Sequence, residues 1–266
     1  MATLQVQIVT YGQAGLDRLS AHRHPQIDGV RWLVSCQNPD GPVSIPPDLD
    51  SREDFTFVFH ADRGVIRNRN HALDATDPSA DIILLGDDDA DYSEEGIRAL
   101  VEAFERHPSA GIMCFRYRCL GRYVKPYGDG EFDLASPPKG WYPGAIEIAF
   151  RRSALGDIRF NENLALLSDK IQAGEDTVFF TDMMRRTSGL GIPVDLCEHN
   201  NPGTGERMGH DPEFIKLHGA CMTHIKPFSW PLRLVAHAWR SPVPTLFYLR
   251  HAFEGARLAR RLKIFK

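Results

Sequence analysis

The chain has 266 residues, of which 42% are hydrophobic and 25% are charged, with a formal net charge of -4. This is the ordinary composition of a globular protein, long enough for one large α/β domain or two small domains. The five cysteines are scattered and form no C-x-x-C pair, which argues against a disulfide framework and a structural zinc site and favours a reducing cytoplasm.

Segments with strand and helix patterns alternate along the chain. In chain order we predict strands at 5–10, 32–36 and 55–59, a helix at 65–75, a strand at 81–85, a helix at 94–106, strands at 112–117 and 145–150, and a helix from near Gly174. Such alternation is typical of an α/β fold with a mostly parallel, Rossmann-like sheet flanked by helices. The glycine- and proline-rich stretch between Gly121 and Pro143 is expected to be irregular, and irregular stretches of this length are usually functional or disordered.

The last part of the chain is strongly basic. Residues 225–266 contain nine Lys and Arg against one acid, Glu254, so this tail carries a charge of +8 and the rest of the chain -12. Aromatic residues lie between these charges, and from Thr245 onward the spacing allows an amphipathic helix. Two interpretations stay open: peripheral contact with an anionic membrane, or a helical cap packed on the main domain. A nucleic-acid partner is not expected, because the remaining chain is acidic and has no nucleic-acid motif.

No stretch reaches the roughly 20 apolar residues of a membrane-spanning helix, and no signal-peptide pattern opens the sequence. We therefore expect a protein that neither enters the secretory route nor crosses a bilayer.

The strand predicted at 81–85 ends in three consecutive carboxylates, Asp87, Asp88 and Asp89. In open α/β sheets ligands bind outside the carboxyl ends of the strands, so these acids should face a site. Two carboxylates about 4 Å apart repel by roughly 4 kcal/mol at an effective dielectric near 20, a cost that a cation would offset. The triplet therefore suggests a hard divalent metal. An EF-hand loop starting at Asp87 is excluded, because Tyr92 and Arg98 stand where glycine and glutamate are needed.

Two further alternatives explain the triplet less well. An aspartyl-phosphate phosphatase would carry its acids near the N-terminus, and a nucleotidyltransferase would have a glycine-rich loop where this chain has Thr10 to Gly15.

Two other segments carry charge suited to a site. Gly174-Glu175-Asp176 begins a predicted helix, where acids are favoured by the helix dipole and so could be only a cap. Arg69-Asn70 lies in the helix before the triplet, where arginine suits a diphosphate.

Taken together and in this order, these segments resemble a bacterial family 2 glycosyltransferase of the GT-A fold. The resemblance covers roughly residues 4–200. It rests on a first strand ending in Thr10, the segment Gly64 to Leu73 with Arg69-Asn70, the aspartate triplet, and Gly174-Glu175-Asp176. It implies a divalent metal, Mn²⁺ or Mg²⁺, that bridges the diphosphate of a nucleotide-sugar donor.

The resemblance also implies a role for each matching residue. Asp87 and Asp89 would bind the metal, and Asp87 would also face the donor. On the donor side, Asp88 would touch the ribose or sugar, Arg69 would lie near the nucleotide and Thr10 near the base. Glu175 would lie near the acceptor or donor sugar, and Asp176 would be the catalytic base. Inverting transfer needs such a base to take the proton from the acceptor hydroxyl.

A histidine after the Glu-Asp helix often completes the metal site in this fold. His199 is the preferred candidate because it ends a strand-like run just before a glycine-containing loop, although His210, His218 and His224 are also available. The loop Gly203 to Arg207 could close over the diphosphate.

One departure from the family concerns the second strand, which commonly ends in aspartates that read the base. This chain has Ser35-Cys36-Gln37 there, so a backbone group, Ser35 or Gln37 would have to substitute, and UDP is expected only as the usual donor.

The sequence is thus interpreted as a glycosyltransferase domain at 1–224 followed by a basic amphipathic helical tail at 225–266. The expected activity is metal-dependent inverting transfer of a hexose to a glycan or lipid-linked acceptor in surface polysaccharide synthesis. It would take place in the cytoplasm or on the inner face of the cell membrane. The alternative is a non-catalytic GT-A domain that binds nucleotide or glycan as a scaffold.

Overall fold

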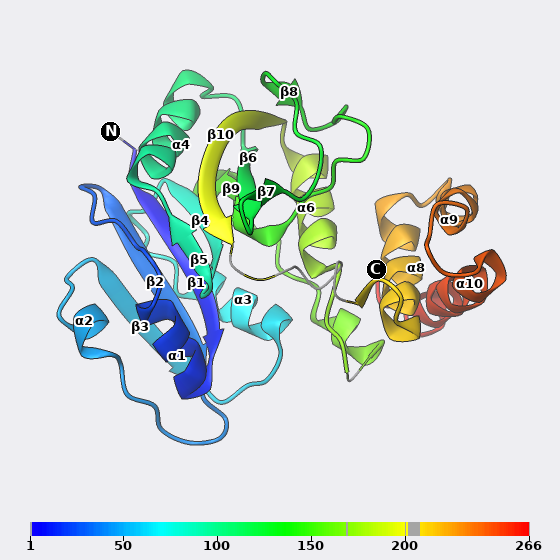
Figure 1. Ribbon diagram of the computed structural model, residues 1–266, viewed down its shortest axis with the longest axis horizontal. Helices are drawn as coiled ribbons and strands as arrows, with labels where there is room; N and C mark the ends of the chain where they lie inside the picture. Colours follow the sequence, from blue (N-terminus) through cyan, green and yellow to red (C-terminus); the bar gives the residue numbers. More distant parts are fainter. Residues whose placement is uncertain (1, 169, 200, 202–207, 266) are drawn as a thin grey trace. The chain divides into compact units, whose positions relative to one another are not determined.

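The computed structural model describes residues 2–168, 170–199, 201 and 208–265. The chain folds into two compact units, shown in Figure 1: Met1–Arg159 with Asp182–Asn201, and Phe160–Thr181 with Pro202–Lys266. The boundaries of these packing units differ from those of the functional domains expected at 1–224 and 225–266. The functional domains stay a prediction.

The first unit is built on one ten-stranded sheet in which most long strands run parallel. The order is β3-β2-β1-β4-β9-β6-β10-β5, with β7 beside β6 and β8 beside β10. β1 is parallel to β2 and β4, β3 is parallel to β2, and β10 is parallel to β6, whereas β9 is antiparallel to both of its neighbours. The strands are β1 Leu4–Tyr11, β2 Val30–Gln37, β3 Phe55–His60, β4 Ile82–Asp87, β5 Ala90–Tyr92, β6 Ile112–Cys119, β7 Arg122–Tyr123, β8 Phe132–Asp133, β9 Ile148–Arg151 and β10 Gly189–His199.

The predicted mixed α/β architecture, a mostly parallel sheet flanked by helices, is confirmed. The helices of this unit include α1 Gly12–Ser20, α2 Pro47–Asp50, α3 Val65–Asp74, α4 Glu94–Arg106 and α5 Arg152–Leu155. Helix α1 follows β1 directly and was not predicted, because Gly12 and Gly15 interrupt its short apolar pattern. The strand predicted at 145–150 is wrong in its first half: a 3₁₀ turn, η1 Ala145–Glu147, precedes β9.

Helix α4 shows how local sequence fixes the chain behind the aspartate triplet. Ser93 is the N-cap, and its hydroxyl accepts a hydrogen bond from the backbone N–H of Gly96 at 2.9 Å. Ile97, Leu100 and Phe104 recur at helical spacing and are fully buried in the core of the first unit. The helix therefore begins just after β5 and holds that short strand in place.

A buried ion pair holds the irregular segment between β6 and β9. The side chains of Glu147 and Lys125 are both fully buried, and Lys125 Nζ lies 2.6 Å from Glu147 Oε1. Glu147 also accepts hydrogen bonds from the Tyr127 hydroxyl at 2.8 Å and from Gly144 N at 2.9 Å. The last of these bonds closes the η1 turn, which explains why residues 145–147 are not a strand. Burial raises the pKa of Glu147, and Lys125 opposes that rise.

The second unit is helical where it is described beyond residue 208. It contains η2 Glu162–Leu166, the start of α6 Glu175–Arg186, α8 Pro212–Ile225, α9 Trp230–Ala238 and α10 Thr245–Arg261. The predicted helix from Thr245 is thus confirmed. α8 and α10 pack closely because glycines meet backbone: a Cβ on Gly219 would lie 1.9 Å from the carbonyl oxygen of Ala252, and one on Gly255 1.8 Å from that of Lys216.

The five cysteines are all buried. Within the described residues no helix is both long and apolar enough to cross a bilayer.

We predict that Glu147→Gln lowers the free energy of unfolding by about 3–5 kcal/mol, because Lys125 then stays buried without its counter-charge. Urea unfolding measures this change. Glu94→Gln is the matched control, since Glu94 pairs with Arg98 on the surface of α4 and such pairs contribute about 0.5 kcal/mol. Similar losses in the two variants would contradict a special role for the buried pair.

Candidate active site

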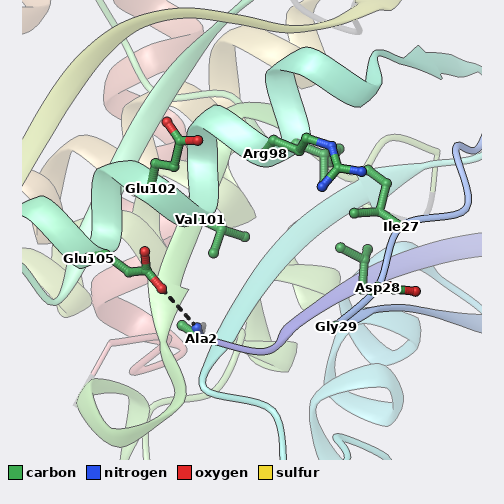
Figure 2. A pocket seen from close by; sticks show the side chains of 10 residues that line it. Ala2, Ile27, Asp28, Gly29, Arg98, Val101, Glu102 and Glu105 are labelled. Carbon is green, nitrogen blue, oxygen red and sulfur yellow. Dashed lines mark hydrogen bonds between the residues drawn. The ribbon is translucent and has the colours of Figure 1, made fainter.

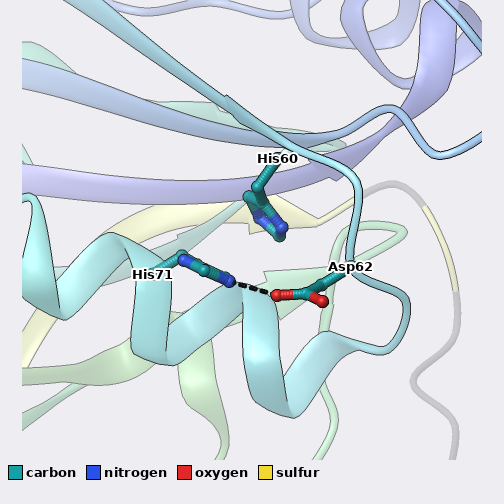
Figure 3. Close-up of side chains that lie close together, drawn as sticks. All are labelled: His60, Asp62 and His71. Carbon is teal, nitrogen blue, oxygen red and sulfur yellow. Dashed lines mark hydrogen bonds and ion pairs between the residues drawn. The ribbon is translucent and has the colours of Figure 1, made fainter.

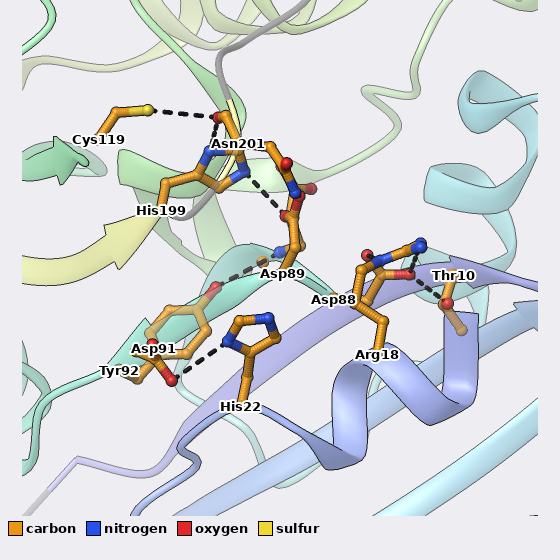
Figure 4. Close-up of polar contacts among 12 residues, drawn as sticks. Thr10, Arg18, His22, Asp88, Asp89, Asp91, Tyr92, Cys119, His199 and Asn201 are labelled. Atoms are coloured by element: carbon orange, nitrogen blue, oxygen red, sulfur yellow. Dashed lines mark hydrogen bonds and ion pairs between the residues drawn. The ribbon is translucent and has the colours of Figure 1, made fainter. Parts of the chain in front are cut away.

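The aspartate triplet lies at the carboxyl end of β4, in the turn to β5. Gly86 precedes it, and a Cβ there would lie 2.8 Å from the Tyr92 hydroxyl. That hydroxyl is buried and accepts a hydrogen bond from Asp87 N at 3.4 Å. The turn needs glycine for this close approach, and the three adjacent carboxylates that follow have different partners. Figure 4 shows the partners of Asp88 and Asp89.

Asp88 turns inward to α1 and the end of β1. Arg18 binds it with two hydrogen bonds, Nε to Oδ1 at 2.9 Å and Nη2 to Oδ2 at 2.7 Å, and the Thr10 hydroxyl donates to Oδ2. Burial raises the pKa of Asp88 above its ordinary value, while Arg18 and Thr10 oppose that rise. Gly15 permits the arrangement, since a Cβ there would lie 2.0 Å from Thr10 Oγ1. The predicted donor residues Thr10 and Asp88 are thus in direct contact.

Asp87 pairs with Arg69 of α3. The Arg69 side chain is buried, its Nη1 donates to the carbonyl oxygen of Gly86 at 2.7 Å, and its Nη2 lies 2.5 Å from Asp87 Oδ1. One guanidinium therefore binds both the backbone and the side chain at the end of β4, a geometry that lysine could not provide. The Asp87 side chain is about one-third exposed, so it remains accessible to a ligand.

Asp89 faces the end of β10. Strand register places His199 opposite Ala90, and His199 Nε2 lies 2.8 Å from Asp89 Oδ1. The Asn201 amide donates to Asp89 Oδ2 at 2.8 Å. Burial by itself would raise the pKa of Asp89, but the hydrogen bonds with His199 and Asn201 outweigh it and hold the pKa at about 2. Asp89 is therefore ionised at neutral pH.

Asp87, Asp89 and His199 come together as one group that could hold a metal. Their ligand atoms all lie within 4.8 Å of one another. Two carboxylate oxygens and one imidazole nitrogen are a reasonable donor set for a divalent first-row ion. The residues present therefore fit the metal that the resemblance implied, and β10 places His199, the third ligand predicted from sequence, beside the two aspartates.

A second group, His60, Asp62 and His71, fits a metal less well (Figure 3). His71 Nε2 lies 2.7 Å from Asp62 Oδ2, but the two imidazole rings are stacked, with centroids 3.9 Å apart and a 30° tilt. An ion binds an imidazole nitrogen in the plane of the ring. Because the rings of His60 and His71 are stacked, their nitrogen lone pairs lie in nearly parallel planes and do not converge on one point. One ring would have to rotate before both could bind the same ion.

The end of β2 offers little polar surface for a base. Gln37 is buried and its amide donates to the carbonyl oxygen of Gly64 at 3.0 Å, while Ser35 is fully buried and lies 3.4 Å from His60 Nε2. Two exposed groups nearby are Tyr11, which pairs with Gln37 in the register of β1 and β2, and Asp40. The Tyr11 hydroxyl donates a hydrogen bond of 2.5 Å to the Asp40 carboxylate.

The second acidic pair begins α6 in the second unit. Gly174 has a φ of 85° and accepts the first helical hydrogen bond from Val178 N at 3.0 Å. Glu175 and Asp176 occupy the first turn and are half-buried, and Asp176 Oδ1 accepts from Thr177 N at 2.6 Å. The helix N-terminus favours negative charge at both residues. The predicted loop 203–207 lies outside the described residues.

Two residues of the site were missed by sequence reasoning. Arg18 lies eight residues after Thr10 on the unpredicted helix α1, and Asn201 lies two residues after His199. A prediction of a helix at Gly12–Ser20 would have placed Arg18 close to the end of β1, because the helix follows that strand directly. Nothing in the sequence distinguishes Asn201 from its neighbour Asn200.

A small pocket lies elsewhere in the first unit (Figure 2). It is lined by Ala2, Ile27, Val30, Val101 and Glu105, among others. Ala2 and Val30 stand at the amino ends of β1 and β2, whereas ligands of such sheets bind at the carboxyl ends. We therefore do not assign this pocket to the candidate site.

Comparison with known proteins agrees with this geometry. Residues 38–158 match the model of the glycosyl transferase family 2. No curated protein matches the sequence. Among solved structures, S. aureus TarS 1–349 superposes with a TM-score of 0.60 at 11% identity, covering 97% of this chain and 91% of that one.

Two other TarS structures have a similar fold. The complex of S. aureus TarS 1–349 with UDP-GlcNAc matches with a TM-score of 0.57 at 12% identity, covering 98% and 92% of the two chains. A longer S. aureus TarS structure matches at 0.58 and 11% identity over 97% of this chain and only 43% of its own, so this chain spans less than half of that protein. Residues 38–158 are thus similar to family 2 glycosyltransferases, and the fold of the chain is that of the TarS structures.

Proposed function

We propose that the protein is a metal-dependent inverting glycosyltransferase that moves a hexose from UDP to a hydroxyl of a glycan or lipid-linked acceptor, in surface polysaccharide synthesis in the cytoplasm. The observation that carries the proposal is the convergence of Asp87, Asp89 and His199 at the carboxyl end of the sheet. The solved complex of TarS with UDP-GlcNAc supports a UDP-linked donor.

The donor side would be organised by residues of the first unit. A divalent ion held by Asp87, Asp89 and His199 would neutralise the charge that develops on the departing diphosphate. The imidazole favours Mn²⁺ over Mg²⁺, because Mg²⁺ prefers oxygen ligands. Thr10 and Asp88 would lie at the base and ribose. Asp88 would also hold Arg18, whose side chain is 43% exposed and whose guanidinium is suited to a phosphate. Arg69 would fix the orientation of Asp87.

The acceptor side would use the start of α6. Asp176 would take the proton from the acceptor hydroxyl as it attacks the anomeric carbon, and Glu175 would bind the acceptor or donor sugar. The Thr177 N–H and the helix N-terminus favour the carboxylate form that a base needs.

We predict that Asp89→Asn abolishes manganese-dependent binding of UDP, because the substitution removes a charged ligand and keeps the size of the side chain. Calorimetric titration of the full chain with UDP, with and without Mn²⁺, measures this loss. Asp17→Asn, an exposed carboxylate on α1, should bind UDP as the wild type does. Equal Mn²⁺ dependence of UDP binding in Asp89→Asn and the wild type would overturn the metal assignment.

We predict that Asp176→Asn lowers turnover by about 10²–10⁴-fold, the usual contribution of a general base, while UDP binding stays within a few fold. Release of UDP from UDP-GlcNAc in the presence of candidate acceptors or water measures turnover. Asp182→Asn on the same helix is the control and should turn over normally. Unchanged turnover in Asp176→Asn would exclude this residue as the base.

The same measurements separate an enzyme from a scaffold. A scaffold would bind UDP or a glycan but release no UDP from a donor. Its ligand binding would respond equally to Asp176→Asn and Asp182→Asn. Retention of both acidic sites supports the enzyme.

A further inference from the structure

The outer side of α9 and the turns on either side of it expose several large apolar residues. Phe228 is 100% exposed, Leu246 83%, Trp239 78% and Leu232 77%. We call these four residues the α9 apolar surface. They lie within 19 consecutive residues that connect α8 to the first turn of α10. Single exposed apolar residues are common, but such a concentration indicates a binding surface.

Helical geometry explains why these side chains are not used in packing. Trp230, Leu234 and Ala238 recur every four residues and form the buried stripe of α9. At 100° per residue, Leu232 and Trp239 lie seven residues apart on the opposite side of the helix. The buried stripe already contributes to the core of the second unit with Tyr248 and others. The α9 apolar surface is thus left over after the helices have packed.

The charged Lys and Arg side chains of the segment that carries this surface are all positive, with no acid among them. Residues 226–253 contain no Asp or Glu, and their Lys and Arg are all exposed: Lys226, Arg233, Arg240 and Arg250. Apolar and aromatic side chains among basic ones fit an interface that is apolar inside and negative outside. A symmetric contact with a second copy of the chain would bring these positive charges against each other, which disfavours a dimer through this face.

We propose that the α9 apolar surface docks on an anionic lipid bilayer, with Leu232 and Trp239 inserted among the acyl chains and the surrounding Arg and Lys at the headgroups. The inference differs from the amphipathic helix expected from Thr245. α10 uses its small residues, Ala252, Gly255 and Ala256, in packing within the second unit, and Gly255 lies against α8. The lipid-facing element is therefore α9 and its turns. This inference does not depend on transferase activity.

Co-sedimentation of the full chain with vesicles tests the proposal. We expect binding to vesicles of phosphatidylcholine mixed with phosphatidylglycerol, weaker binding to phosphatidylcholine alone, and loss of binding as salt is added. Leu232→Ser should weaken binding roughly tenfold or more, since it removes one inserted leucine. Leu166→Ser is the matched control, because Leu166 is also an exposed leucine of the second unit, at 63%, outside this surface. Arg233→Gln with Arg240→Gln should weaken binding to the anionic vesicles only.

Tryptophan fluorescence gives a second measurement that does not rely on affinity. Trp32 and Trp230 are buried and Trp141 is partly buried, whereas Trp239 is exposed, so insertion of Trp239 should produce a blue shift on adding anionic vesicles. Trp239→Phe should remove the shift and keep the binding. The proposal is overturned if Leu232→Ser and Leu166→Ser bind alike, if no blue shift accompanies binding, or if sedimentation velocity shows a dimer that Leu232→Ser dissociates.

Discussion

The arrangement of the site depends on the separation of three adjacent carboxylates. Asp87, Asp88 and Asp89 would repel one another if they faced the same space, and the turn after Gly86 prevents this by giving each its own partners. Each carboxylate meets a basic side chain from a different element: α3, α1 and β10. The triplet therefore links the ends of β1, β4 and β10 to one another, in addition to the part that it would take in the proposed metal site.

The middle aspartate contributes differently from its neighbours. Asp88 is buried and both of its oxygens are already hydrogen-bonded, whereas Asp87 keeps about a third of its side chain exposed and Asp89 shares a ligand group with His199. A buried carboxylate with a fixed arginine is well suited to positioning that arginine. In the proposed transferase, Asp88 would act on the donor largely through Arg18.

The second unit combines closely packed helices with large apolar residues that remain exposed. Its helices pack through small residues, with Gly219 and Gly255 against backbone, and this close packing leaves the large residues Leu232 and Trp239 outside. The α9 apolar surface is thus a consequence of how the core is filled. If it binds lipid, a transferase acting on lipid-linked acceptors would be held where its acceptor is embedded.

The sequence by itself determined the strands β1 to β4 and β6, the helices α3 and α4, and the identity of the acidic residues. These depend on local pattern: apolar runs of strand length, the Ser93 cap of α4, and an apolar stripe at helical spacing in α10. It also selected His199, because a residue at the end of a strand is recognisable from the pattern around it.

Only the tertiary structure decided which basic residue pairs with which aspartate. Arg18 is 70 residues from Asp88, and His199 is 110 from Asp89, so these contacts depend on strand order and on the register of β10 against β5. It also decided that residues 145–147 form a turn, since the buried Glu147 carboxylate binds Gly144 N and the distant Lys125. Local pattern specifies elements because their hydrogen bonds are short in sequence, whereas a site is made by contacts that the chain forms only after the elements have packed.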